Sequence, residues 1–166
     1  MTTLYVDNIA PNLQSKISAP NLTLPSGSVV QVVASELTSS PTTQSTSWVS
    51  TGLTASITPS STSSKILVVY AGMYAANNLS NHWGSHGIQK NGVILNSGSM
   101  FGPSIANATN SGQVTLTKLD SPNTTSSTTY TVVYRSEGNS TLVRINDGWG
   151  SGENYRATLT LMEIAG

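Results

Sequence analysis

The sequence contains no cysteine, which excludes disulfide bonds, thiolate metal sites and a cysteine nucleophile. Charged residues make up only 8% of the chain, far below the roughly 25% of an ordinary domain. The seven Lys and Arg balance the seven Asp and Glu, and neither sign is concentrated in any stretch. A nucleic-acid partner, which needs a run of cationic side chains along its phosphates, is therefore not expected.

Long hydrophobic runs are missing as well. No apolar stretch approaches the roughly 18 residues that cross a bilayer, and the first residues, MTTLYVDNIAPNLQSK, lack the basic start and apolar core of a signal peptide. Neither membrane insertion nor signal-dependent export is expected. Aromatic residues reach only 6%, so each monomer has little material for a large core, and a homo-oligomer with a shared interface is favoured.

From residue 29 onward the chain shows the pattern of β-strands. Short alternating or apolar runs are separated by Gly, Asn, Ser and Pro clusters, and no window has helical periodicity. Roughly eight to ten strands of this spacing predict an all-β, antiparallel, jelly-roll-like sandwich over residues 29–166. The runs lie at 29–36, 46–51, 53–58, 65–76, 85–91, 93–100, 113–120, 128–137, 141–147 and 155–164.

The alternation also predicts which side chains face the core. In residues 155–164 one face carries Ala157, Leu159, Leu161 and Glu163, and the opposite face is more polar. The run KILVVYAGM (65–73) is apolar on both faces, which predicts a central strand with the second sheet on one side and a neighbouring subunit or the N-terminal arm on the other. Asn91-Gly92 between two such runs predicts a tight hairpin.

Residues 1–28 are expected to form an extended N-terminal arm. Prolines at positions 11, 20 and 25 prevent a helix or a central strand there. The arm carries four apolar side chains that could lie in a groove on another protein, so it is a candidate attachment segment; the alternative is a frayed terminus. The attachment residues are Tyr5, Val6, Ile9 and Leu13.

Several stretches resemble the short tail-fibre and virion structural proteins of tailed phages, especially phages of cyanobacteria. They are LYVDNIAPNLQSKISAPNLTLPSGSVVQVV, SWVSTGLTASITPSSTSSKILVVYAGMY, SPNTTSSTTYTVVYRS and the ending LTLMEIAG. The resemblance spans nearly the whole chain and includes no catalytic signature. It implies a virion location, an N-terminal arm that binds other virion proteins, and a jelly roll of the tumour-necrosis-factor and complement C1q type assembled as a homotrimer.

No residue pattern points to catalysis or to a cofactor. His82 and His86 are the only histidines, and on a strand they would lie about 13 Å apart; they are interpreted as surface or loop residues, with a metal on a symmetry axis as the alternative. No Gly-x-Ser-x-Gly elbow occurs. The seven acids are scattered, which disfavours a glycosidase.

Two loops combine aromatic rings with amides, the groups that stack on sugars and bond their hydroxyls. They are the candidate surface for a host glycan or receptor, although Trp83 and Trp149 could instead cap the core. The first contains Asn77, Asn78, Asn81, His82 and Trp83, and the second contains Asn146, Asp147, Trp149, Asn154 and Tyr155.

The expected function is therefore that of a non-enzymatic tail-fibre protein. Its arm would attach it to the particle, and its loops would contact the host surface through repeated weak contacts. One alternative is a capsid-decorating fibre or cement protein with a purely structural role. A glycan depolymerase is the third interpretation.

Overall fold

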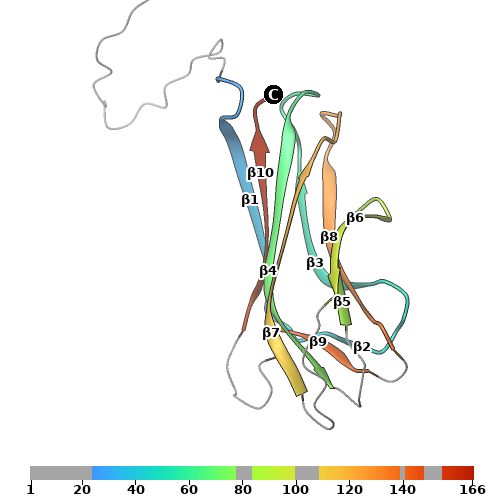
Figure 1. The fold of residues 1–166 in the computed structure, drawn as a ribbon. Helices are drawn as coiled ribbons and strands as arrows, with labels where there is room; N and C mark the ends of the chain where they lie inside the picture. The colour runs from blue at the N-terminus through green and yellow to red at the C-terminus, as the bar shows by residue number, and fades with distance from the viewer. Residues whose placement is uncertain (1–23, 78–83, 100–108, 139–140, 148–154) are drawn as a thin grey trace, which may run out of the picture.

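The structure is a computed structural model that describes residues 24–77, 84–99, 109–138, 141–147 and 155–166. Within these ranges the chain forms strands and no helix, which confirms the predicted all-β fold (Figure 1). Residues 1–23, which make up most of the predicted arm, lie outside the described residues.

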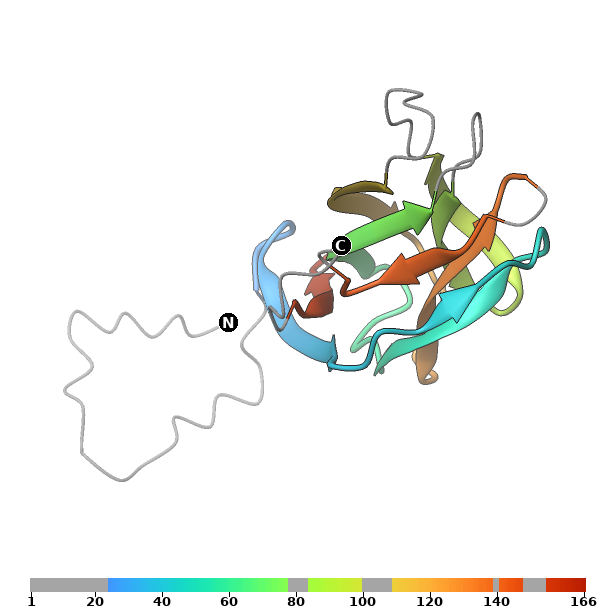
Figure 2. The same cartoon turned by 90° about the horizontal axis from the view of Figure 1, so that it is seen from below.

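The strands form two antiparallel sheets that face each other (Figure 2). We call the first the β4 sheet; it contains β1 (Val29–Leu37), β10 (Ala157–Ile164), β4 (Lys65–Asn77) and β7 (Thr109–Asp120), extended by the short β9 (Val143–Ile145) and β2 (Thr42–Thr43). The second, the β8 sheet, contains β3 (Val49–Ile57), β8 (Thr128–Ser136), β5 (Gly84–Lys90) and β6 (Val93–Ser99).

The strand order is that of a jelly roll. Leaving aside the two short strands, the first, eighth, third and sixth strands form one sheet, and the second, seventh, fourth and fifth form the other. Each sheet thus pairs strands from both halves of the chain, which is the two-Greek-key arrangement of this fold. The predicted jelly-roll-like sandwich is therefore confirmed.

Two details of the strand prediction are wrong. Runs 46–51 and 53–58 form the single strand β3, because Gly52 takes a φ of 88° and the chain passes through a bulge there without leaving the sheet. The short strand β2 was not predicted. The Asn91-Gly92 hairpin is confirmed, with φ of 50° and 82° at the two residues.

The core lies between the two sheets and follows the predicted alternation. On β10 the four side chains at 157, 159, 161 and 163 are buried, and on β8 the same is true of Tyr130, Val132 and Tyr134. The core also holds Leu53, Ile57, Ile66, Val68, Tyr70, Ile88 and Ile145. Burying these apolar side chains is the main source of stability in a chain without disulfide bonds.

Strand β4 is central, as its two-sided apolar pattern predicted. It pairs with β10 and β9 along one edge and with β7 along the other. Ile66, Val68 and Tyr70 are fully buried against the β8 sheet, whereas Leu67 and Val69 point to the outer face and are partly exposed. What covers this outer face stays a prediction.

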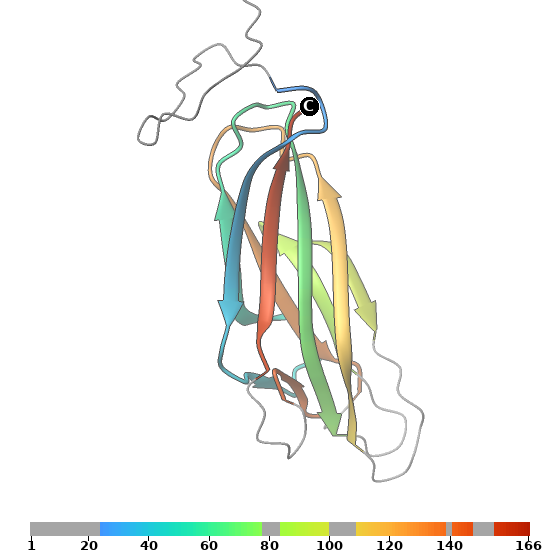
Figure 3. The same ribbon diagram turned by 90° about the vertical axis from the view of Figure 1, so that its left-hand side faces the viewer.

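The sandwich has two ends, which we call proximal and distal (Figure 3). At the proximal end the chain enters β1, beside the C-terminal residues: Gly27 N donates to Ala165 O (2.8 Å) and Ala165 N to Ser28 O (2.9 Å). Register places Val29, Ile164 and Lys65 side by side at this end. At the distal end, Asn77 of β4 pairs with Thr109 of β7.

Buried polar side chains tie the proximal end together. Asp120 accepts hydrogen bonds from Lys90 Nζ (2.5 Å) and Tyr130 Oη (2.7 Å), so one carboxylate links β7 to β5 and β8. Glu163 accepts bonds from Ser60 N (2.7 Å) and Ser64 Oγ (2.7 Å) and thereby anchors the connection between β3 and β4. The proximal end is thus held by buried hydrogen bonds, including the Lys90–Asp120 ion pair, as well as by apolar contacts.

Candidate functional site

The strand ends that flank the two predicted receptor loops lie toward the distal end of the sandwich, together with those that flank segment 100–108, for which no receptor role was predicted. Segments 78–83, 100–108 and 148–154 lie outside the described residues, but the residues that flank them are described. Asn77 pairs with Thr109, and Ser85 pairs with Ser99, so the first two segments begin and end at neighbouring strand ends. The third follows β9, which pairs with the distal part of β4.

Most of the predicted site residues fall in the undescribed segments. The structure describes only two of the eight receptor residues, Asp147 and Tyr155. The others are Asn78, Asn81, His82, Trp83, Trp149 and Asn154, and the attachment residues Tyr5, Val6, Ile9 and Leu13 also lie outside the described ranges. The glycan-binding role of these side chains stays a prediction.

Asp147 and Asn146 both take part in interactions within the domain. Arg144 Nη1 donates to Asp147 Oδ2 at 2.7 Å, three residues along the chain. Asn146 adopts a positive φ of 58° and is buried; its Nδ2 donates to Leu37 O (2.6 Å) and Ser39 O (3.0 Å). Asn146 is therefore a structural residue, because its buried side chain bonds the backbone of the same domain. The prediction that Asn146 belongs to a receptor surface is wrong.

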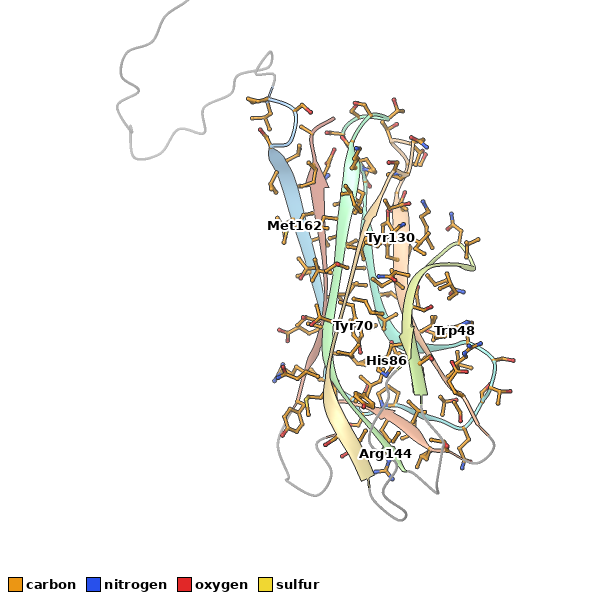
Figure 4. All side chains as sticks on the ribbon, viewed as in Figure 1. Trp48, Tyr70, His86, Tyr130, Arg144 and Met162 are labelled. Carbon is orange, nitrogen blue, oxygen red and sulfur yellow. The ribbon has the colours of Figure 1, made fainter. Side chains whose placement is uncertain are left out.

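His86 is not a surface or loop residue, so this interpretation was wrong. It lies on β5 with its side chain fully buried between the sheets, where its ring stacks on Tyr70 (centroids 5.9 Å apart) and meets the edge of Tyr74 (Figure 4). Its Nδ1 shares a hydrogen bond with Tyr70 Oη at 3.1 Å. Burial lowers the pKa of His86 to about 4, so the ring is neutral at physiological pH. A fully buried ring cannot reach a metal on a symmetry axis.

Tyr155 lies beside Arg156 at the rim of a depression of about 270 Å³ in the outer face of the β4 sheet. The floor is Ala71 of β4, and the opposite wall includes Gln113 of β7. Strand pairing places these lining residues side by side, because Ala71 pairs with Thr158 of β10 on one side and with Thr115 of β7 on the other. The pocket was not predicted, since it joins residues that are far apart in the sequence.

A second cluster that the sequence reading missed lies on the β8 sheet. The guanidinium of Arg135 sits 4.6 Å from the ring centre of Trp48, and Arg135 Nη2 also contacts Glu137 Oε1 at 2.8 Å. Ser85 Oγ donates to the same Glu137 oxygen. Trp48 and Arg135 are separated by 87 positions in the sequence, and only the pairing of β3 with β8 brings them together.

All of the described carboxylates have partners within the fold. Glu36 pairs with Arg156 at 3.1 Å, and the other four bond Lys, Arg, Ser, Tyr or Gln side chains. No group of three or more His, Asp or Glu side chains is placed to hold a metal in the described part of the chain. The described residues also contain no helix that could cross a membrane.

Comparison with known proteins gives no family for this chain. No protein-family model matches it, and no curated protein is significantly similar to it.

Proposed function

We propose that the chain is a non-enzymatic virion structural protein of the tail-fibre type. The arm at residues 1–28 attaches it to other virion proteins, and the distal end of the sandwich contacts a host-surface glycan or receptor. The copies act together as a homotrimer, so that several weak contacts add up to stable adsorption.

The observation that carries this proposal is that the chain enters the sandwich at one end and the strands that flank the first predicted receptor loop finish at the other. The chain enters the sandwich at the proximal end, where Gly27 and Ser28 bond Ala165. The flanks of segments 78–83 and 100–108 lie at the distal ends of their strands, and segment 148–154 begins two residues after Asn146, whose N–H donates to Met73 O of β4. A domain held at one end and carrying its long loops at the other suits a protein that bridges a particle and a surface.

The proposed oligomer is supported by an apolar area on the outer face of the β4 sheet. Register aligns Val32, Met162, Leu67 and Leu119 in one row across four neighbouring strands. Val32 is 56% exposed and Leu119 is 51% exposed, although both belong to regular strands. We call this row, together with Val29 and Ile164 next to it, the outer apolar patch. Contiguous exposed apolar side chains of this kind commonly mark an interface between proteins.

The patch also shows why a second copy is a suitable partner. The row contains no charged side chain. On the same face the nearest ones are Lys65 at the proximal edge and the Glu36–Arg156 pair toward the distal end, whereas Lys118 and Asp120 beside Leu119 belong to the opposite face of β7. An uncharged apolar surface matches another copy of itself without leaving an unpaired charge buried. Met162 projects from this face, away from the β8 sheet (Figure 4).

The proposal is tested by variants of particles that carry the chain. Deleting residues 1–23 leaves every described residue in place and should abolish incorporation into the particle. Replacing Trp83 and Trp149 by Ala should leave incorporation unchanged and reduce adsorption to host cells at least tenfold. The control is Val93→Ala, which removes a 62% exposed apolar side chain on the β5–β6 hairpin and should change neither quantity.

The same experiment separates the alternatives. Normal adsorption by the Trp83→Ala, Trp149→Ala double variant, with normal incorporation, contradicts host recognition and favours a capsid-decorating or cement protein. Normal incorporation after removal of residues 1–23 contradicts the attachment role of the arm. Release of new reducing ends from host polysaccharide by the purified protein would instead establish the depolymerase interpretation.

A further inference from the structure

The pocket beside Tyr155 lies on the polar half of the face that carries the outer apolar patch. Going from the patch toward the distal end, register gives first the row Ala34, Thr160, Val69 and Thr117, and then the row Glu36, Thr158, Ala71 and Thr115. The pocket occupies the second row and the step beyond it. It is therefore separate from the patch and closer to the proposed receptor end.

The depression exists because a small side chain lies between larger ones. Ala71 is flanked on its own face by Thr158 and Thr115, and Met73 follows it along β4. Strand β10 begins at Ala157, so Tyr155 and Arg156 precede its first paired residue and line the pocket from the end of the strand. The result is an open pocket of about 270 Å³, slightly below the roughly 300–1,000 Å³ of pockets that hold drug-sized ligands.

The lining offers the groups that recognise a sugar ring. Tyr155 presents an aromatic ring, and rings of this kind stack on the apolar face of a pyranose. Thr115, Thr158 and Gln113 supply two hydroxyls and one amide, which can both donate to and accept from sugar hydroxyls. A volume this small suits a single sugar residue better than a longer segment.

Arg156 adds a cation that favours an acidic ligand. Its only ion-pair partner in the described residues is Glu36, at 3.1 Å, and both side chains are more than half exposed. Exposed pairs of this kind are weak, and a planar guanidinium has five N–H donors, of which this contact uses one. A ligand carboxylate can therefore bind Arg156 in the two-pronged geometry that Arg favours.

We propose that this pocket binds one carboxylate-bearing sugar residue, a hexuronic acid, with its carboxylate on Arg156 and its ring against Tyr155. The inference rests on the proposed function and names the chemical class of the host ligand. Binding of one monosaccharide is weak, and several copies of the chain on one particle raise the total strength.

The test titrates the full-length chain with sodium glucuronate and galacturonate and, in parallel, with glucose and galactose, followed by ligand-observed NMR. At least one uronate should bind, and the matching neutral sugar should bind about tenfold more weakly, because a charge-assisted contact is lost. Arg156→Gln should weaken uronate binding by a similar factor. Glu36→Gln should strengthen it, because it removes a competing carboxylate from Arg156.

A matched control is Lys65→Gln, which removes the same charge from the same face but at the proximal end of β4, and should leave uronate binding unchanged. Equal binding of uronate and neutral sugar, no binding of either uronate, or no effect of Arg156→Gln would each overturn the inference. If no uronate binds but particles with the Trp83→Ala, Trp149→Ala change lose adsorption, this inference fails and the proposed function stands. If Arg156→Gln weakens uronate binding about tenfold while neither this variant nor the Trp83→Ala, Trp149→Ala variant changes adsorption, the pocket assignment stands and the proposed function fails.

Discussion

Tyr70 of β4 and His86 of β5 form a buried polar pair across the two sheets of the sandwich. The Tyr70 Oη and His86 Nδ1 atoms are 3.1 Å apart and the rings are stacked. Burial raises the pKa of Tyr70 and lowers that of His86 to about 4, so both side chains are neutral in the folded protein at neutral pH. His86 Nε2 has no hydrogen-bond partner among the described residues.

The first prediction concerns acid stability. Unfolded His86 takes up a proton near its ordinary pKa of 6.5, whereas the folded side chain resists protonation until about pH 4. The unfolded state thus binds more protons across this window, and the free energy of unfolding should fall by about 3 kcal/mol from pH 6.5 to pH 4. Urea denaturation at several pH values measures this fall in the free energy of unfolding.

The matched variant replaces both partners, Tyr70→Phe with His86→Phe, so that no buried polar atom of the pair is left alone. In this double variant the free energy of unfolding should not show the fall between pH 6.5 and pH 4 that is assigned to His86, whatever its value at pH 7. An unchanged slope in the double variant would assign the acid sensitivity to other groups.

The second prediction concerns Glu163, whose side chain is enclosed at the proximal end. Burial alone would raise the pKa of Glu163, but hydrogen bonds from Ser60, Gln31 and Ser64 outweigh it and hold the pKa at about 2. Glu163→Gln places an amide N–H₂ among these donors and should cost about 2 kcal/mol of unfolding free energy at pH 7.

The stabilisation by Glu163 is fully present above its ordinary pKa of 4.5 and is lost as the pH falls toward 2. The difference between wild type and Glu163→Gln should therefore shrink between pH 4.5 and pH 2, a window that overlaps the one assigned to His86 only between pH 4.5 and pH 4. A difference that is constant with pH would show that the carboxylate charge is not what anchors the β3–β4 connection.

The third prediction concerns the bulge in β3. Gly52 has a φ of 88°, a conformation that costs a residue with a side chain about 1–2 kcal/mol. Gly52→Ala should lower the unfolding free energy by that amount. Gly98→Ala is the control: its added methyl would lie 3.4 Å from Leu116 with no positive φ, so its effect should be smaller. Equal effects would argue against backbone strain at Gly52.

The fourth prediction concerns the outer apolar patch. Purified wild-type protein should have three times the 17.3 kDa mass of one chain in light-scattering measurements. Leu119→Asp should dissociate it, because association would bury an unpaired charge. Val93→Asp, on a side chain that is more exposed and outside the patch, should leave the mass unchanged. A monomeric wild type would contradict the shared interface.

Much of the fold could be predicted from the sequence because the period of two fixes which side chains face the core. The burial of Ala157, Leu159 and Leu161, the central place of β4 and the hairpin at Asn91 all follow from local patterns. The break expected at Gly52 was wrong, since a single glycine can produce a bulge as readily as a turn.

The candidate site was harder to predict because it depends on contacts between distant segments. Nothing local to His86 shows that Tyr70 of the other sheet will enclose it. The pocket likewise joins Ala71, Gln113 and Tyr155 from three strands or strand ends, and only the order of the strands brings them together. Trp48 and Arg135 are likewise distant in the sequence and meet only because β3 pairs with β8.

We propose that the two ends of the sandwich have different partners. Imaging intact particles by electron cryo-microscopy, with this structure fitted into the density, tests it most directly. The proposal predicts that the proximal end, marked by Val29 and Ile164, faces the particle and that the distal end, marked by Asn77 and Thr109, points outward. Density with the distal end packed against the particle and the proximal end exposed would contradict it.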